Sequence, residues 1–405
     1  MINIRICYMN EELEDALIEN LKQQKQERKQ RYTRPELFVM IEKFMIRKRL
    51  IGYGGMAINS LLPIDKQFYS DIDVPDYDFF SPNAEEDSIM LSNEILKLNQ
   101  DVEVKSALFE GTYKIFVNAI PIVDITQIDK ELFDNLHKSA IRYRGIFYAP
   151  YNYLRMSMYQ ELSRPMGDLS RWQKVYQRLN LMNETHPLVI RRIDVAETNE
   201  HDSVVFNEMV DKMKSFVILG DYAMYYYQHL FPKKYQTEKQ HCLYVQVENE
   251  KDVWSKLKGY KYKLKKHSNK FITFYQVFID SKCMLYVFIT DSCQSYNTVD
   301  GFKIASYDTM LSIYYILSFM DHIPEINIRK LLSYCFLLEN IKKTNDPVMR
   351  RFRMPCNGTQ KTYEEIRQDR DKKYKIYKKT GKYRHLFFRY RPKTHRKKPN
   401  KKLML

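Results

Sequence analysis

The stretch PDYDFFSP at residues 75–82 carries two aspartates two positions apart in a short segment that also holds three aromatic residues. Its aromatic content favours a β-strand. Side chains at positions i and i+2 of a strand project to the same side, so Asp76 and Asp78 are predicted to face one cleft. Such pairs also cap turns on solvated surfaces, so this pair indicates a functional site only in combination with the motifs around it.

A third aspartate lies in a predicted hairpin farther along the chain. The segments YKIFV (113–117) and IVDIT (122–126) are strand-like and are joined around Asn118-Ala119. Asp124 sits inside the second segment, where an isolated carboxylate is expensive to bury without a partner or a metal ion. It is the predicted third acid, and a carboxylate bonded to backbone amides is the alternative.

A glycine pair precedes these acids. In YGGMAIN (53–59), Gly54-Gly55 opens a predicted short helix that ends near Pro63. Backbone N–H groups at such a helix start can approach a triphosphate, although most glycine pairs mark ordinary turns. Nucleotidyl transfer uses two divalent ions, and magnesium prefers a few carboxylate oxygens together with substrate phosphates. A glycine pair, an Asp-x-Asp strand and a lone strand aspartate in this order fit that chemistry.

These motifs resemble the nucleotidyltransferase superfamily of DNA polymerase β. With EGTYKIFVN (110–118) and RWQKVYQRL (171–179), the chain resembles more closely the poly(A) polymerase catalytic subunits of large cytoplasmic DNA viruses, of the poxvirus and mimivirus type. The resemblance covers about residues 45–185 with specific motifs. It implies an α+β fold with a mixed sheet and a second, degenerate copy of the same fold.

The resemblance also implies the site residues. Two ions, Mg²⁺ or Mn²⁺, are expected at Asp76, Asp78 and Asp124, which are both the catalytic and the metal-binding residues. The triphosphate of ATP is expected at Gly54 and Gly55. The reaction is the addition of AMP from ATP to RNA 3′ ends.

Lys174 is a further nucleotide-binding residue implied by the resemblance alone. The residues themselves predict a helix that presents Arg171, Lys174 and Arg178 on a solvated charged face, with Trp172 packed inward.

Asp71 and Asp73 form a competing pair. Strand parity fits both pairs, and the spacing from Gly55 to either is longer than is usual in the superfamily. Asp76 and Asp78 are preferred because apolar residues follow them, whereas Pro75 ends the other candidate soon after it starts.

The chain also contains an internal similarity. YKIFVN (113–118) matches YQVFID (275–280), VDIT (123–126) matches VFIT (287–290), and GIFYAPY (145–151) matches GFKIASY (301–307). The glycine pair corresponds to Gly220-Asp221. Four matches in the same order predict a duplicated unit, with chance similarity of apolar strands as the alternative.

The second copy is predicted to be catalytically inactive. Phe288 is expected at the position of Asp124, and the strand equivalent to the Asp-x-Asp segment, residues 243–247, has no acid.

The positive charge is concentrated at the C-terminal end. Residues 341–405 hold 23 Lys and Arg against 5 Asp and Glu, which leaves 43 basic and 45 acidic residues in the rest of the chain. Aromatic residues are interleaved with these cations between residues 361 and 402. This combination is typical of single-stranded nucleic acid binding, and a disordered solubilising tail is the alternative.

Four parts of the chain follow from these patterns. They are an N-terminal helical segment (1–45), a catalytic nucleotidyltransferase domain (46–190), a degenerate copy (191–340) and a basic aromatic RNA-binding tail (341–405). The six cysteines lack the spacing of zinc ligands and are predicted to be reduced thiols. No apolar run is long enough to span a membrane, so an intracellular protein is expected.

The predicted function is template-independent polyadenylation of mRNA. A non-catalytic RNA-binding or processivity subunit with a decayed core is the first alternative, and a transferase acting on another acceptor such as tRNA ends is the second. The three acids of the first copy, Asp76, Asp78 and Asp124, argue against decay. The resemblance implies that the protein binds RNA and ATP. It also implies a homodimer or a complex with a cap-methyltransferase-like processivity partner. The expected location is the host cytoplasm or viral factory, with packaging in the virion.

Overall fold

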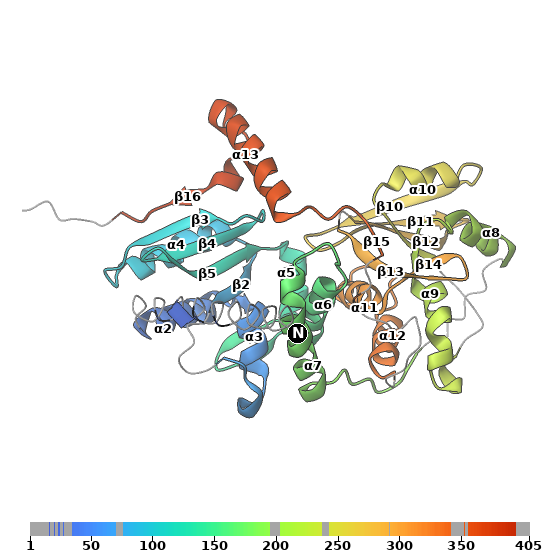
Figure 1. Ribbon diagram of the computed structural model, residues 1–405, viewed down its shortest axis with the longest axis horizontal. Helices are drawn as coiled ribbons and strands as arrows, with labels where there is room; N and C mark the ends of the chain where they lie inside the picture. The colour runs from blue at the N-terminus through green and yellow to red at the C-terminus, as the bar shows by residue number, and fades with distance from the viewer. Residues whose placement is uncertain are drawn as a thin grey trace, which may run out of the picture. The chain divides into compact units, whose positions relative to one another are not determined.

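The computed structural model folds into two compact units (Figure 1). Apart from a few single positions, it describes residues 35–69, 76–194, 203–236, 243–290, 292–341 and 355–393. Residues up to 128, 141–148 and from 370 onward form the first unit, and residues 129–140 and 149–369 form the second. These boundaries differ from the predicted ones at two places. Residues 149–190 belong to the second unit, and the chain returns to the first unit at Arg370.

The first unit is built on a mixed sheet whose strands, among the described residues, run in the order β16-β3-β4-β5-β2-β1-β7-β6. Its strands are β1 (Ile51–Gly52), β2 (Tyr77–Ser81), β3 (Val102–Ser106), β4 (Thr112–Val117), β5 (Ile120–Gln127), β6 (Ile141–Tyr143), β7 (Ile146–Tyr148) and β16 (Arg389–Tyr390). Its helices include α2 (Pro35–Lys48), α3 (Gly54–Leu61) and α4 (Ala84–Leu96). Helix α4 packs on β3, β4 and β5, and α3 packs on β2.

Several local predictions are confirmed in this unit. The spacing of Phe38, Ile41 and Phe44 predicts a helix from Pro35 with these residues on one side, and this helix buries Ile41 and Phe44 and half-buries Phe38. Strands β4 and β5 form the expected antiparallel hairpin. Of the predicted N-terminal helical segment (1–45), residues 1–34 lie almost entirely outside the described residues.

The second unit carries a sheet with the strand order β10-β11-β12-β9-β8-β14-β13-β15 over the described residues. Its strands are β8 (Val217–Leu219), β9 (Leu243–Val247), β10 (Tyr262–Ser268), β11 (Thr273–Ile279), β12 (Lys282–Ile289), β13 (Gln294–Val299), β14 (Phe302–Ala305) and β15 (Cys356–Asn357). Its helices include α5 (Lys130–Lys138), α6 (Tyr151–Leu162), α7 (Trp172–Thr185), α8 (Ser203–Met213), α9 (Gly220–Tyr227), α10 (Glu250–Lys256), α11 (Tyr307–Leu317) and α12 (Ile328–Glu339). Helix α11, which is buried along its whole length, packs against α6 and α12.

The two sheets repeat one topology. The run β3-β4-β5-β2-β1-β7-β6 in the first corresponds strand for strand to β10-β11-β12-β9-β8-β14-β13 in the second. The hairpin turns also match, because Asn118-Ala119 and Asp280-Ser281 all have positive φ. Gly54 and Gly220 both have φ +70° at the first residue of a helix. The predicted duplication of the fold is therefore confirmed.

One residue assignment between the copies is wrong. On the parallel strand pairs, Asp78 lies opposite Asp124 in the first unit, and Tyr244 lies opposite Tyr286 in the second. The position of Asp124 is therefore held by Tyr286, and not by Phe288. Both hairpins have two-residue turns and a bulge at the same place, so no two-residue gap separates them.

Part of the basic C-terminal segment lies within the described residues and is folded. Helix α13 (Tyr363–Thr380) precedes β16, which pairs with β3 as an edge strand of the first sheet. The guanidinium of Arg370 donates hydrogen bonds to the backbone carbonyls of Ala107, Ser106 and Leu386. Residues 370–391 therefore complete the first unit, and are not a free tail.

Glu103 of β3 anchors this edge strand. Its side chain is 9% exposed and pairs with Arg389, Arg391 and Lys105. Burial opposes ionisation, but the hydrogen bonds from these cations outweigh it and lower the pKa of Glu103 from 4.5 to about 2.

Because the folded pKa lies below the unfolded one, this group stabilises the first unit above pH 4.5, and the contribution is lost as the pH falls toward 2. We expect Glu103→Gln to lower the free energy of unfolding at pH 7 and to flatten its decline between these pH values. Urea unfolding at a series of pH values measures both effects. Glu110→Gln, at an exposed partner of His385, is the matched control. An unchanged pH dependence in Glu103→Gln would contradict the assignment.

The prediction that all cysteines are reduced is wrong for two of them. Cys293, just before β13, and Cys356 of β15 form a disulfide. The sequence spacing gave no sign of this pair, since 63 residues separate its members. Cys283 and Cys335 are not in a disulfide, and Cys7 and Cys242 lie outside the described residues. No helix among the described residues is long and apolar enough to cross a membrane.

Candidate active site

Three neighbouring strands of the first sheet bring the predicted glycine and two of the acids together. Strand β2 pairs with β1 on one side and with β5 on the other. In the parallel β2–β5 pair, Asp78 lies directly opposite Asp124. On the β1 side, the amide N–H of Tyr53 donates to the carbonyl oxygen of Asp78, at 2.9 Å. The chain then turns into α3 through Gly54.

Gly54 is required by the position of Asp78. Its φ is +70°, a region that L-residues with side chains rarely adopt. A Cβ atom at this position would lie 2.6 Å from Oδ2 of Asp78. The helix that starts here has no side-chain capping bond from Tyr53. The N–H groups of its first turn, which includes Gly55, are thus of the kind that water or a bound anion satisfies.

Asp124 is held by a lysine from the neighbouring strand. Lys114 of β4 lies opposite Asp124 in the hairpin, and its Nζ is 2.6 Å from Oδ2 of the aspartate. Burial raises the pKa of Asp124, the pairing with Lys114 lowers it, and the charge of Asp76 raises it again, so that the pKa lies above its ordinary value. The carboxylate of Asp124 therefore points toward the ammonium of Lys114, and its pKa depends on the charge of Asp76.

Tyr53 packs beside Asp78 and Asp124. Its ring stacks on Phe80 with the centroids 3.9 Å apart, and its hydroxyl hydrogen-bonds that of Thr126 at 2.8 Å. Burial, and then the charge of Asp78, raise the pKa of Tyr53 above its ordinary value. The phenol thus stays protonated and adds no charge beside the carboxylates.

Asp76 lies just outside the strand that holds Asp78. It is exposed and comes one residue before β2 begins at Tyr77. Asp71 and Asp73, the competing pair, lie outside the described residues. Within the described ranges, no three His, Cys, Asp or Glu side chains are close enough to hold a metal ion by themselves.

Lys174 lies in the second unit, on α7, and the structure does not place it in the same unit as the acids. Its side chain is exposed, and Trp172 is half-buried with its indole N–H bonded to the carbonyl of Glu161. Desolvation and the charges of Arg178 and Arg171 lower the pKa of Lys174. The helix therefore presents the solvated basic face that its spacing predicts.

The equivalent place in the second unit is filled by aromatic rings. Tyr244 and Tyr286 replace the two acids, and their ring centroids are 4.6 Å apart. The amide of Gly220 is already bonded to the hydroxyl of Tyr314. Asp221 does not face this group but pairs with buried Lys330, at 2.6 Å. The second unit therefore keeps the fold with tyrosines in place of the two acids and with the amide of Gly220 already bonded.

Two site residues escaped the sequence interpretation. Lys114 could have been found, because a hairpin with its turn at residues 118–119 places Lys114 opposite Asp124 once the bulge after Ile115 is counted. Tyr53 could not, since its contacts with Phe80 and Thr126 cross three strands.

Comparison with known proteins finds similarity over part of the chain. The family model described as poly(A) polymerase catalytic subunit matches residues 39–168. A relative named as such a subunit in African swine fever virus (isolate Pig/Kenya/KEN-50/1950) is 25% identical over 178 residues, 42% of this chain and 37% of its own length. One from Acanthamoeba polyphaga mimivirus is 26% identical over 211 residues, 48% of this chain and 36% of its own. The chain thus matches little more than a third of the length of these relatives.

The fold match extends much farther. The crystal structure of the Megavirus polyadenylate synthase superposes with a TM-score of 0.79 at 20% identity, and the alignment covers 94% of this chain and 85% of that one. The predicted resemblance is confirmed: residues 39–168, the segment that contains Gly54, Asp78 and Asp124, match the family model of poly(A) polymerase catalytic subunits, and the chain has the fold of the Megavirus polyadenylate synthase.

Proposed function

We propose that this protein is a template-independent poly(A) polymerase that joins AMP from ATP to RNA 3′ ends. The observation that carries the proposal is the in-register pair Asp78 and Asp124, with the backbone of Gly54 against the first carboxylate. A decayed core would have kept the fold and lost these groups, as the second unit has.

The side chains of the first unit fit a divalent ion completed by substrate. Magnesium is usually held by one or two carboxylates and by substrate phosphates. Asp78 and Asp124 supply two adjacent carboxylates, Asp76 is the nearby third, and Asp124 already binds the ammonium of Lys114. Bound Mg²⁺ or Mn²⁺ would supply charge stabilisation for the attacking hydroxyl and the leaving pyrophosphate.

The protein's own groups position the reactants. The amides of Gly54 and Gly55 are proposed to hold the triphosphate. The RNA 3′-hydroxyl attacks the α-phosphorus of ATP, a new P–O bond forms, and the bond to pyrophosphate breaks. Burial raises the pKa of Asp124, and the ion pair with Lys114 opposes this shift.

Incubating the purified protein with a 5′-labelled RNA oligomer, Mg²⁺ or Mn²⁺ and one nucleotide at a time tests this function. Extension with ATP above the other three nucleotides is the expected result. Binding of RNA with no extension under any of these conditions would favour a non-catalytic RNA-binding subunit.

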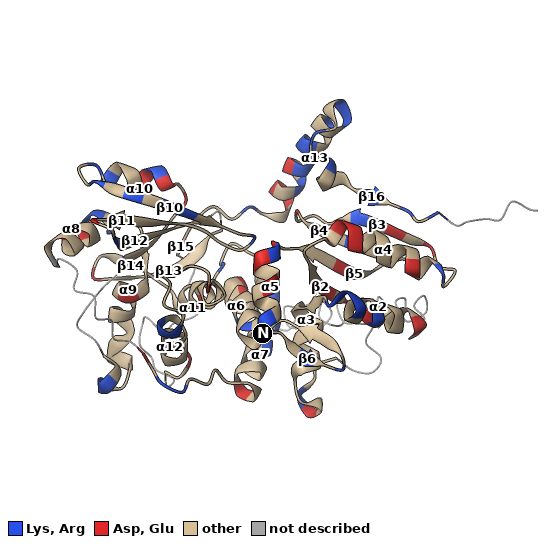
Figure 2. Ribbon diagram, turned by 180° about the vertical axis from the view of Figure 1, so that it is seen from behind, with Lys and Arg blue, Asp and Glu red and all other residues tan. Residues whose placement is uncertain are grey.

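Helix α13 is the proposed RNA-binding element of the basic segment. Figure 2 shows basic residues spread along this helix. Of its aromatic rings, that of Tyr377 stacks on Phe387 with the centroids 5.3 Å apart, whereas Tyr363 and Tyr374 are 46% and 40% exposed. Contacts between its cations and the phosphates are the expected main basis of RNA binding, and the exposed rings can add stacking on bases.

We expect replacement of three exposed α13 lysines, Lys375, Lys378 and Lys379, by Ala to weaken RNA binding and to reduce the slope of log K against log salt by up to about 2, because each phosphate contact contributes about 0.7. Alanine keeps the helix propensity. Fluorescence anisotropy at several salt concentrations measures the slope.

The control removes the same charge elsewhere, from exposed Lys258, Lys261 and Lys263 of the second unit. Equal losses in both triple variants would mean that only net charge matters, and an unchanged slope in the α13 variant would exclude α13 as a binding element.

A further inference from the structure

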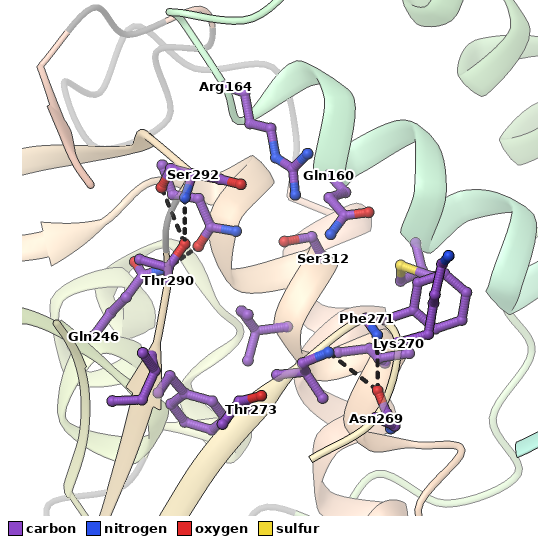
Figure 3. Close-up of a pocket in the computed structure, with 17 residues that line it drawn as sticks. Gln160, Arg164, Gln246, Asn269, Lys270, Phe271, Thr273, Thr290, Ser292 and Ser312 are labelled. Carbon is purple, nitrogen blue, oxygen red and sulfur yellow. Dashed lines mark hydrogen bonds between the residues drawn. The ribbon is translucent and has the colours of Figure 1, made fainter. Parts of the chain in front are cut away.

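The second unit contains a cavity that the proposed reaction does not use. It has a volume of about 350 Å³ and lies against the ends of β9, β12 and β13, closed by α6, α11 and the loop between β10 and β11 (Figure 3). None of the acids, glycines or lysines assigned to nucleotidyl transfer lines it. Its volume is at the lower end of the range for small-molecule sites and suits one nucleotide.

The floor of the cavity is a pair of buried amides. Gln246 of β9 is 1% exposed and Gln294 of β13 is 4% exposed, and Nε2 of Gln246 donates to Oε1 of Gln294. Oε1 of Gln246 has no hydrogen-bond partner among the described residues. Leaving a buried carbonyl oxygen without a hydrogen-bond donor is unfavourable, so a bound N–H donor would be stabilised here.

The walls combine flat apolar surfaces with hydroxyl groups. Phe271 and Phe288 line the cavity, together with isoleucines from β12 and α11. Thr290 and Ser312 add hydroxyls, and Figure 3 shows the side chains of Arg164 and Gln160 pointing toward Ser312. A planar heterocycle can stack on the aromatic surfaces while its edge bonds to the amides, as adenine does with Gln side chains.

The charge of the lining is entirely positive. Arg164 and exposed Lys270 contribute cations, and none of the lining residues is an Asp or Glu. A ligand with a neutral polar ring and a phosphate satisfies both parts of the cavity.

We propose that this cavity binds a single nucleotide, with its base over the Gln246–Gln294 pair and its phosphate at Arg164 and Lys270. The same chemistry is present in free AMP and in one residue of an RNA chain. The site lies in the unit without catalytic acids, so binding there does not depend on the proposed reaction.

Isothermal titration of the full-length protein in EDTA tests the proposal, because metal-dependent chemistry is then silent. The probes are AMP, a five-residue oligo(A) and inorganic phosphate. Gln246→Leu removes the amide and keeps the volume, and Ser312→Met fills the cavity from another element. We expect each variant to weaken AMP or oligo(A) binding about tenfold, the effect of one lost hydrogen bond to a buried group.

Lys270→Ala should weaken the same probe, whereas Lys266→Ala, at an exposed lysine that does not line the cavity, should not. A loss seen with AMP assigns the site to free nucleotide, and a loss seen only with oligo(A) assigns it to RNA. Unchanged affinity for both probes in Gln246→Leu and Ser312→Met, with only phosphate binding affected by Lys270→Ala, would overturn the proposal. The titration measures binding and not RNA extension. A negative polymerase assay would therefore leave the nucleotide-binding proposal standing, and a negative titration would leave the proposed polymerase activity standing.

Discussion

Asp78→Asn and Asp124→Asn are each expected to reduce RNA extension by at least about a hundredfold while the protein stays folded. Both carboxylates lie in register on adjacent strands, and an amide of the same shape keeps the packing but cannot replace a charged metal ligand. Initial rates of extension with saturating ATP, together with thermal unfolding curves, measure activity and fold separately. Asp76→Asn is expected to act in the same direction.

The control for these variants is Asp65→Asn, an exposed aspartate of the same unit that lies after α3. It should leave the rate unchanged. Normal activity in Asp78→Asn, together with loss in Asp71→Asn or Asp73→Asn, would show that the other pair of acids holds the metal.

Gly54→Ala is expected to lower extension by about a hundredfold, through the same carboxylate. The new Cβ would lie 2.6 Å from Oδ2 of Asp78, so the aspartate must move away from its position opposite Asp124. Loss of a correctly placed metal ligand has the effect of its removal. The φ of +70° adds a stability cost of about 1–2 kcal/mol for any residue with a Cβ.

The chain offers a matched control for this variant in its own second copy. Gly220 has the same φ of +70°, and a Cβ there would lie 2.7 Å from Cγ of Tyr244. Gly220→Ala is therefore expected to destabilise the protein at least as much as Gly54→Ala and to retain the rate of extension below its melting temperature. Equal loss of activity in both variants would mean that strain, and not the position of Asp78, is responsible.

The sequence predicts the parts of this structure that depend on neighbouring residues. Alternating apolar residues and a two-residue turn specify the hairpin of β4 and β5, and the glycine at +70° specifies the start of α3. The repeat can be recognised in the sequence for the same reason, because both copies keep the hairpin with its two-residue turn and the glycine at the helix start. A shared site for Asp78 and Asp124 was expected from the family motif, and the parallel pairing of their strands places the two residues opposite each other.

Features set by contacts between distant segments were not predictable. Phe288 was assigned to the position of Asp124 because VFIT matches VDIT, whereas hairpin register places Tyr286 there. Edge strand β16 has only two residues and no periodicity of its own. It pairs with β3, and the ion pair between Arg389 and Glu103 joins the two strands. The Cys293–Cys356 disulfide likewise depends on the pairing of β13 with β15.

The discontinuous first unit has a consequence for biosynthesis. Its sheet needs residues from 51–148 and also Arg389 and Tyr390, whereas the second unit is complete by residue 369. Because translation proceeds from the N-terminus, the unit with the acids is finished after the unit without them. Until then β3 is an open edge, the kind of surface on which nascent chains aggregate. A ribosome that stops before residue 389 would therefore release a protein whose second unit is intact and whose acid-bearing sheet is unprotected.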